Sequence, residues 1–334
     1  MPAAKVVVTD FIEENLDWEA GELSRRGVEY SFHQLNFAPA KDVIAATRDA
    51  DVVVANYTAI TPEVIRGWEK CRLVIRHGTG YDNFDLGALD RAGIPLTYIP
   101  DYCIEEVAEH AIALIFSCGR RLPHGKQVFE ASLGRPRWNL LAVVPAFRMA
   151  GSTLGIVGCG RIGSCLFRKI QSFGFRFLIC DPYLSPERKQ ELGIEVVTKE
   201  RVFREADFIT LHTPLNQETR HMVNAEMLAL MKRSAYLINT SRGPVVDTNA
   251  LADALRRGQI AGAGIDVYDA DPPAADCGLL GLPNVTLSPH TAWYSEDSAW
   301  DIRRLIMLEI DRFLAGLPPR YVANPGYTSS GGRS

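Results

Sequence analysis

Short apolar runs alternate with segments of helical periodicity through the N-terminal third of the chain. Residues 51–55, DVVVA, are apolar at consecutive positions, which is typical of a strand buried on both faces of a parallel sheet. The expected strands are residues 5–9, 29–34, 51–55, 73–76 and 95–99, and the expected helices are residues 18–26, 41–49, from 61 onwards and 86–92. Strands that alternate with helices in this way predict a parallel sheet with helices on both faces.

A long apolar segment at residues 104–122 follows and predicts a helix whose apolar face is too wide for the protein surface. We therefore expect this helix to be buried between domains or subunits. Residues 123–151 show little periodicity and are expected to form an irregular arm that includes a short helix.

The alternation of strands and helices starts again at residue 153. The expected strands are residues 153–157, 175–180, 208–211, 235–239, 263–267 and 285–287, and the expected helices lie near 162–173, 225–231 and 248–257. These strands suffice for a second doubly wound sheet. A last helix is expected at 295–315, where it ends at Gly316 and could rejoin the first domain. The fold class predicted is α/β, with two doubly wound parallel-sheet domains.

Composition narrows the possible functions. The chain has 334 residues, a net charge of −4 and an apolar fraction of 47%, which is typical of a soluble protein with two domains. This charge argues against nucleic acid or an anionic membrane as the main partner. No apolar run approaches the roughly 20 residues that span a bilayer, and residues 1–10 are too acidic for a signal peptide. The seven dispersed cysteines indicate reduced thiols, a cytoplasmic location and no metal site.

The stretch from residue 153 to 183 has the pattern of a dinucleotide-binding βαβ unit. Gly158, Gly160 and Gly163 have the spacing G-x-G-x-x-G between an expected strand and helix, so they permit a tight turn and close approach of a pyrophosphate. Asp181 ends the next strand, where its carboxylate can bind the ribose hydroxyls and repel a 2′-phosphate. An ordinary βα turn could carry the same glycines, but the strand, helix and acid together favour NAD, with NADH preferred over NADPH.

Three chemically active side chains follow later strands of the second half. Arg242 follows residues 235–239, Asp271 follows the strand that ends at 267, and His290 follows residues 285–287. Ligands of open α/β sheets bind at this carboxyl edge. Hydride transfer to a 2-oxo acid needs a guanidinium that holds the carboxylate and an imidazole that protonates the alkoxide. A neighbouring carboxylate would stabilise the imidazolium.

Each of these side chains has a simpler interpretation when it is taken alone. A single arginine on a loop is more often a solvated surface charge, and a single histidine is more often structural. An acid before a proline usually belongs to a turn. Only their joint placement at the strand ends favours a catalytic role.

The motifs around these residues resemble those of a known family. The segments RHGTGYDNFD, PDYCIEEVAEHAIAL, GCGRIG, TSRGPVVD, GAGIDVYDADP and SPHTAWYS resemble the signatures of the D-isomer-specific 2-hydroxyacid dehydrogenase family, in the same order. Within that family, Arg76 and the segments DPYLS and AWYSEDS resemble the C-terminal-binding-protein branch, which includes NADH-binding corepressors as well as bacterial enzymes. The resemblance implies a Rossmann NAD-binding domain inserted into a flavodoxin-like substrate domain.

The predicted domain bounds follow from this arrangement. Residues 1–102 and 293–325 are expected to form the substrate domain, residues 103–292 the NAD-binding domain, and residues 326–334 a disordered tail. The resemblance also implies a homodimer formed through the NAD-binding domains.

The resemblance further implies roles for individual residues. Arg242 would orient the substrate and His290 would be the acid/base. Asp271 stands where the family usually has glutamate. Its shorter side chain could still reach His290, or the pair could be longer or water-bridged, and a weaker pair would lower the pH optimum. The residues expected at the cofactor are Thr79, Val107, Gly158, Gly160, Arg161, Ile162, Asp181, His212, Thr213, Pro214, Thr219, Thr240, Ser241, Arg242, Asp266 and His290.

The residues expected at the substrate are Tyr57, Arg76, Gly78, Thr79, Tyr102, Arg242, His290 and Trp293. The amides of Gly78 and Thr79 would hold the substrate carboxylate. The three aromatic residues are as consistent with core or interface packing as with a pocket. If they line the pocket, they favour a medium or large apolar 2-oxo acid over glyoxylate.

The leading interpretation is an NAD-dependent oxidoreductase that interconverts a D-2-hydroxy acid and its 2-oxo acid. Two alternatives stay open: an NADH-sensing corepressor-like scaffold with vestigial activity, and a dehydrogenase of the phosphoglycerate or hydroxypyruvate type. A formate enzyme is disfavoured, because the resembling formate enzymes carry glutamine at the position of Asp271.

Overall fold

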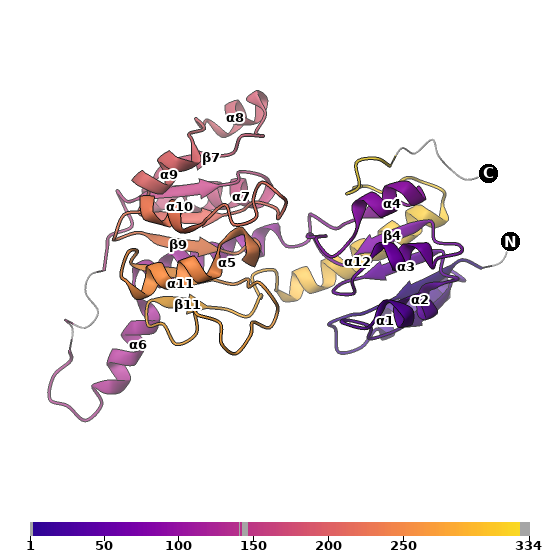
Figure 1. Cartoon of the computed structure of the whole chain (residues 1–334), viewed down its shortest axis with the longest axis horizontal. Coiled ribbons are helices and arrows are strands. Elements are labelled where there is room, and N and C mark those ends of the chain that lie inside the picture. Colours follow the sequence, from indigo (N-terminus) through magenta and orange to yellow (C-terminus); the bar gives the residue numbers. More distant parts are fainter. Residues whose placement is uncertain (1–2, 140, 142–145, 328–334) are drawn as a thin grey trace. The chain divides into compact units, whose positions relative to one another are not determined.

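The computed structural model describes residues 3–139, 141 and 146–327, and the chain divides into two compact units (Figure 1). One unit contains Met1–Tyr102 and Ser295–Ser334, and the other contains Cys103–Tyr294. These bounds differ from the predicted ones only at the second crossover and in the tail. Gly326 was expected to be disordered, but its amide donates to Asp90 Oδ2 at 3.1 Å. The rest of the tail for which disorder was expected, residues 328–334, lies outside the described residues.

Five parallel strands form the sheet of the first unit, in the flavodoxin-like order β2-β1-β3-β4-β5. The strands are β1 (Lys5–Val8), β2 (Glu29–Phe32), β3 (Val52–Ala55), β4 (Leu73–Arg76) and β5 (Leu96–Thr97). The apolar runs of the sequence therefore predicted these strands and their parallel arrangement, whereas the flavodoxin-like fold was implied by the resemblance. Strand β5 is shorter than expected.

The two faces of this sheet bury different residues, because side chains alternate along a strand. Val7, Val53 and Val74 belong to a cluster that includes residues of α2 (Ala40–Thr47), α3 (Pro62–Arg66) and α4 (Leu86–Ala92). Val6 and Val52 belong to a cluster with residues of α1 (Asp17–Arg25) and α12 (Glu296–Leu314). The last helix therefore completes the core of the unit in which the chain begins.

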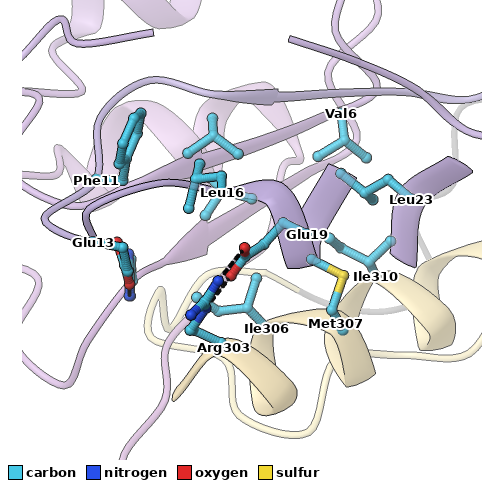
Figure 2. Close-up of a pocket in the computed structure, with 13 residues that line it drawn as sticks. Val6, Phe11, Glu13, Leu16, Glu19, Leu23, Arg303, Ile306, Met307 and Ile310 are labelled. Carbon is cyan, nitrogen blue, oxygen red and sulfur yellow. Dashed lines mark hydrogen bonds and ion pairs between the residues drawn. The ribbon is translucent and has the colours of Figure 1, made fainter. Parts of the chain in front are cut away.

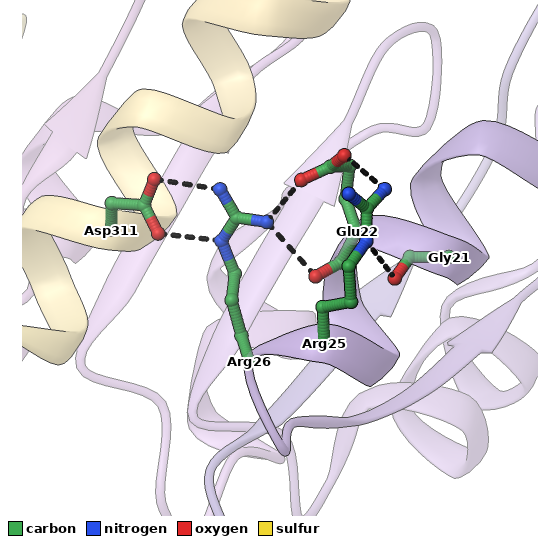
Figure 3. Close-up of polar contacts among 5 residues, drawn as sticks. All are labelled: Gly21, Glu22, Arg25, Arg26 and Asp311. Carbon is green, nitrogen blue, oxygen red and sulfur yellow. Dashed lines mark hydrogen bonds and ion pairs between the residues drawn. The ribbon is translucent and has the colours of Figure 1, made fainter.

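Ion pairs join α12 to α1 at the edge of this core. Arg26, at the C-cap of α1, contacts Asp311 through Nε–Oδ1 at 2.5 Å and Nη2–Oδ2 at 2.8 Å (Figure 3). Arg303 contacts Glu19 through Nε–Oε1 at 2.5 Å and Nη2–Oε2 at 2.6 Å (Figure 2). Both pairs are forked, and this geometry fixes the guanidinium planes as well as their charges.

Six parallel strands form the sheet of the second unit, in the order β11-β10-β9-β8-β6-β7. The strands are β6 (Thr153–Val157), β7 (Arg176–Cys180), β8 (Phe208–Leu211), β9 (Tyr236–Asn239), β10 (Gly262–Ile265) and β11 (Val285–Leu287). An isolated parallel bridge between Ile179 and Val196 continues the sheet beyond β7. The chain order reverses between β6 and β8, and in such sheets ligands bind at the carboxyl ends of the strands at this reversal.

The helix α5 (Ile104–Gly119) packs against β9, β10 and β11. A Cβ added at Gly264 would lie 3.1 Å from Leu114 Cβ, so glycine lets this helix approach β10 closely. The helix is shorter than expected because Arg121 adopts the left-handed conformation, with φ of 52°. None of the described helices is long and apolar enough to cross a membrane.

The remaining helices of the second unit are α6 (Leu122–Ala131), α7 (Arg161–Ile170), α8 (Pro186–Leu192), α9 (Lys199–Glu205), α10 (Ala225–Leu230) and α11 (Thr248–Arg256), with short 3₁₀ turns at Gln171–Phe173 and Gly243–Val245. The helix α6 has no buried residue, and Figure 1 shows it extending away from the sheet of its unit. The helices α8 and α9 were not predicted.

Candidate active site

The glycines of the fingerprint lie between β6 and α7 and have distinct steric environments. A Cβ at Gly158, where φ is 90°, would lie 2.5 Å from the carbonyl oxygen of His212. A Cβ at Gly163 would lie 2.1 Å from the carbonyl oxygen of Gly158. A Cβ at Gly160 would meet nothing within 4 Å, which leaves open space at the start of α7. The turn is therefore packed on its protein side and open where a phosphate would approach the helix N-terminus.

The Asp181 carboxylate, just after β7, lies beside this turn. Its Oδ2 accepts from the amide of Cys159 at 2.8 Å, and its Oδ1 accepts from the amide of Tyr183 at 3.0 Å. The acid is therefore fixed next to the fingerprint, as its position in the sequence predicts.

Two buried hydroxyl groups lie just after neighbouring strands on the other side of the chain reversal. Within the described part of the chain, Oγ1 of Thr213, after β8, and Oγ1 of Thr240, after β9, are buried without a hydrogen-bond partner. Buried polar groups almost always have a partner, so unpaired ones at a strand edge are consistent with a ligand. Together with the open turn and Asp181, these residues fit a dinucleotide.

His212 lies in the same region but is unsuited to proton transfer near neutral pH. Burial lowers the pKa of its imidazole to about 4, and its Nε2 lies 3.0 Å from Thr210 Oγ1. The ring is therefore neutral and structural, although its backbone borders the fingerprint.

His290 and Asp271 form a direct pair at the end of the sheet that carries β10 and β11. His290 Nδ1 lies 2.5 Å from Asp271 Oδ2. Of the alternatives left open by the sequence, the direct contact is the one found, because the loop after β10 brings the shorter carboxylate to the imidazole. Asp271 Oδ1 is buried and has no partner among the described residues.

The loop that carries His290 is anchored by a fully buried acid. Asp266 accepts from Thr291 N and Ala292 N, each at 3.0 Å, and from Ser288 Oγ at 2.6 Å. The backbone amide of His290 also donates to the Asp266 carbonyl at 2.8 Å. Asp266 was expected at the cofactor, and the structure shows that its carboxylate fixes the backbone beside the imidazole. These contacts hold His290 in a left-handed conformation, with φ of 54°.

Arg242 follows β9, and the turn after it packs against the loop that leads to Asp271. A Cβ at Gly243 would lie 2.0 Å from the carbonyl of Tyr268, so only glycine permits this approach. Asn239 Nδ2 donates to the Arg242 carbonyl at 2.9 Å, and Arg242 Nη1 donates to the Ser241 carbonyl at 2.8 Å. The loops that carry Arg242, Asp271 and His290 therefore meet at one edge of the second unit.

The expected substrate residues of the first unit form a tight turn after β4. Arg76 Nη1 donates to Asn56 Oδ1 and to the carbonyl of His77, each at 2.5 Å, and its Nε donates to the carbonyl of Gly80. Gly78 has φ of 144°, and its amide donates to the Arg76 carbonyl at 2.9 Å. That amide was expected to hold a carboxylate, but the turn itself uses it.

The aromatic candidates differ in their surroundings. The Tyr57 side chain is exposed, and its amide donates to the buried Asp10 at 2.5 Å. Tyr102 packs against the apolar cluster beneath α1 and α12, as its packing interpretation predicted. Trp293 makes an edge contact with Tyr294, with the ring centroids 5.4 Å apart. Tyr57 is therefore the exposed aromatic candidate of the first unit.

The other predicted cofactor residues differ in burial and in hydrogen bonding. Val107 is buried in α5, Ile162 packs against the core, and Arg161 is exposed at the start of α7. Thr219 Oγ1 donates to the Pro214 carbonyl at 2.6 Å, and Ser241 Oγ donates to Asn239 Oδ1 at 2.8 Å.

Sequence reasoning missed several polar residues that support the site. Asp10 accepts from Thr58 Oγ1 at 2.7 Å and so fixes the loop that carries Tyr57. His110 Nε2 lies 2.8 Å from Ser288 Oγ, behind the His290 loop. The available signal was only an acid or histidine in an otherwise apolar setting.

In the described ranges, no cluster of three or more His, Cys, Asp or Glu side chains could hold a metal ion.

Comparisons with known proteins agree with this geometry. Residues 112–292 match the family model described as D-isomer specific 2-hydroxyacid dehydrogenase, NAD binding domain. A glyoxylate reductase of Korarchaeum cryptofilum is 38% identical over 284 residues, which cover 84% of this chain and 85% of the relative. A D-3-phosphoglycerate dehydrogenase of Methanocaldococcus jannaschii is 35% identical over 85% of this chain, which spans 53% of that relative.

A solved structure gives the same result for the fold. The D-lactate dehydrogenase of Aquifex aeolicus, in complex with NAD and lactic acid, superposes with a TM-score of 0.83 at 28% identity. The match covers 93% of this chain and 96% of that chain.

Proposed function

Because the chain belongs to the D-isomer-specific 2-hydroxyacid dehydrogenase family, we propose that it interconverts a D-2-hydroxy acid and its 2-oxo acid, with NAD as hydride carrier. His290 is the acid/base and Arg242 orients the substrate. The observation that carries this proposal is the direct contact of 2.5 Å between His290 Nδ1 and Asp271 Oδ2. It lies at the edge of the sheet that also bears the fingerprint. Which branch of the family the chain represents stays a prediction.

The pair determines which ring nitrogen of His290 does the chemistry. A proton held between Nδ1 and Asp271 leaves Nε2 available to the substrate. During reduction, Nε2–H gives its proton to the carbonyl oxygen as negative charge develops there, and during oxidation Nε2 takes the hydroxyl proton back. Asp271 orients the ring and stabilises the imidazolium. Bound NADH supplies the hydride to the carbonyl carbon.

Arg242 and the turn after β4 recognise the carboxylate of the substrate. The planar guanidinium of Arg242 can donate two parallel hydrogen bonds and can polarise the carbonyl group. Since the Gly78 amide is used within the turn, we assign the carboxylate to the amide of Thr79. Arg76 contributes positive charge beneath this turn, where its guanidinium would lie 3.0 Å from a Cβ of Gly78.

We assign the cofactor preference to Asp181. Its carboxylate lies 2.8 Å from the amide of Cys159 in the fingerprint turn. A ribose can donate its hydroxyl groups to this acid, whereas a 2′-phosphate would meet a fixed negative charge. NADH is therefore the preferred reductant.

We propose a homodimer formed through the second unit. The helix α6 has no buried residue, Leu122 is 61% exposed, and the exposed ring of Phe129 stacks on that of Trp138 with centroids 5.5 Å apart. Such an apolar arm is stable in water when a second copy covers it. Phe129→Glu should produce monomers in sedimentation velocity, and an unchanged dimer would remove α6 from the interface.

We also propose a cytoplasmic location, which the free cysteines of the chain support.

The test of function is a panel of 2-oxo acids with NADH and, separately, with NADPH. The panel includes glyoxylate, pyruvate, longer apolar 2-oxo acids and phosphohydroxypyruvate. At least one acid should be reduced with NADH, and the exposed Tyr57 favours an apolar one. His290→Asn should abolish turnover while NADH affinity, measured by fluorescence titration, stays unchanged.

Two outcomes would favour the alternatives. Strong NADH binding with no turnover of any acid would indicate the corepressor-like scaffold. Preferred reduction of phosphohydroxypyruvate would indicate a phosphoglycerate-type dehydrogenase, the activity named for one relative.

A further inference from the structure

The turn at residues 76–80 in the first unit is held from three sides. Arg76 bonds to carbonyl groups within the turn itself. The backbone of Ile99 accepts from Thr79 Oγ1 at 3.1 Å and donates to the Gly78 carbonyl at 3.0 Å. The third contact is made by the side chain of His77, which points away from the turn into the unit.

His77 forms a buried ion pair with Glu13, from the segment between β1 and α1. His77 Nε2 lies 3.2 Å from Glu13 Oε1, and the two side chains are only 7% and 13% exposed. Glu13 Oε2 accepts from the amide of Ile12 at 3.0 Å, and the amide of His77 donates to the Ala55 carbonyl at 2.9 Å. Both ends of the pair are therefore fixed to the backbone.

The surroundings of the pair are apolar. It borders a cavity of about 20 Å³ that is lined by side chains such as Val8, Leu16 and Ile306 (Figure 2). Burial alone would raise the pKa of Glu13, but the hydrogen bond and charge of His77 outweigh burial and lower this pKa to about 2. The attraction between the two groups is therefore strong, as expected where water is excluded.

Another charge lines the same cavity. Arg303 of α12 borders it, and its guanidinium is held by the forked contact with Glu19. The His77–Glu13 pair is thus the link between this buried cluster and the turn after β4. The pair lies inside the unit and away from the turn's open amide, so it would influence an anionic ligand through the geometry of the turn.

We propose that His77 is a positioning residue for the substrate: through Glu13 it anchors the turn at residues 76–80 and so sets the affinity for the 2-oxo acid. This inference rests on the proposed function, which places the substrate carboxylate on the amide of Thr79. Its main effect should fall on substrate affinity, because the fingerprint and the acid/base belong to the second unit, and Thr79 is the one residue of the first unit expected at the cofactor. His77, within the turn, therefore acts on KM and leaves kcat to His290.

The test compares His77→Leu with His77→Gln and with His33→Leu as a matched control. His33 follows β2 of the same unit, and its Nε2 contacts Ser31 Oγ at 3.0 Å. KM for the best acid of the panel, kcat, and NADH affinity are measured for each variant. Binding of oxamate, an inert analogue of a 2-oxo acid, to the protein–NADH complex is measured by calorimetry.

His77→Leu should raise KM and the oxamate Kd about tenfold, the scale of one lost hydrogen bond to a charged group. Its kcat and NADH affinity should stay within about twofold of the wild type. His77→Gln can still donate to Glu13 and should recover most of the affinity, and His33→Leu should behave like the wild type. Unchanged oxamate binding in His77→Leu, or an equal loss of NADH affinity, would overturn the inference.

A double variant separates positioning from folding. His77→Leu leaves the carboxylate of Glu13 buried without its partner, which lowers stability by itself. His77→Leu/Glu13→Leu removes that unpaired charge and should recover the melting temperature while KM stays raised. If KM recovers together with the melting temperature, the pair is only structural. If no acid of the panel is turned over, the proposed function fails. Oxamate binding by the variants then still tests the role of His77. If the wild-type protein binds no oxamate, the inference about His77 is overturned.

Discussion

The His290–Asp271 contact supports a quantitative prediction for Asp271→Asn. The two atoms are 2.5 Å apart, and the side chains are 29% and 30% exposed. A hydrogen bond between charged groups contributes about 1.5–3 kcal/mol. Since both side chains are partly solvated, we expect a loss of about 2 kcal/mol of transition-state stabilisation, or roughly 30-fold in kcat/KM.

The assay is the change in NADH absorbance with the acid chosen from the panel, measured in both directions. Asp271→Glu restores the acid that the family usually carries and should stay within about fivefold of the wild type, because the charge is kept. Asp269→Asn is the matched control, since Asp269 is exposed on the same loop. The reasoning is refuted if Asp271→Asn keeps kcat/KM within twofold of the wild type, or if Asp269→Asn loses as much.

Three further predictions concern stability and cofactor choice. Glu19→Gln leaves the Arg303 guanidinium, 14% exposed, without its carboxylate, and should lower the free energy of unfolding by about 3 kcal/mol in urea titrations. Asp181→Ala should reduce the ratio of kcat/KM with NADH to kcat/KM with NADPH at least tenfold, because KM for NADPH falls. If this ratio is unchanged, Asp181 does not select the cofactor. The Glu13 pKa lies at about 2 instead of 4.5, so its stabilising contribution is complete above pH 4.5 and is lost as pH falls towards 2. The free energy of unfolding of Glu13→Gln should therefore fall less steeply with pH than that of the wild type between pH 4.5 and 2. If the two pH dependences are parallel, the lowered pKa of Glu13 is contradicted.

The parts of the site that sequence could predict depend on local requirements. The fingerprint was predictable because each glycine meets a steric demand within the same turn: Gly163, for example, has no room for a Cβ beside Gly158. Asp181 was predictable because it ends the next strand of the same βαβ unit. Arg242, Asp271 and His290 could be placed at the carboxyl edge because parallel strands end there together.

The parts that sequence could not predict depend on how loops fold. Whether Asp271 reaches His290 depends on the path of the loop after β10, and residue type alone left both a direct and a longer contact open. The internal hydrogen bond of the Gly78 amide likewise depends on the turn geometry and has no sequence signal. The pair between His77 and Glu13 joins two separate βα segments, whose side chains look like unrelated polar residues in the sequence.

Under the proposed role of His77, the helix α12 connects stability to substrate binding within the first unit. Its apolar face completes the core beneath β1 and β3, and Ile306 lines the cavity next to the His77–Glu13 pair. Arg303, one turn earlier on the same helix, is fixed by Glu19 of α1. Loosening this helix would admit water to the cavity, raise the local dielectric constant and weaken the attraction between His77 and Glu13. Mutations in the last helix should therefore weaken binding of the 2-oxo acid before they unfold the unit, even though this helix contributes no side chain to the proposed site.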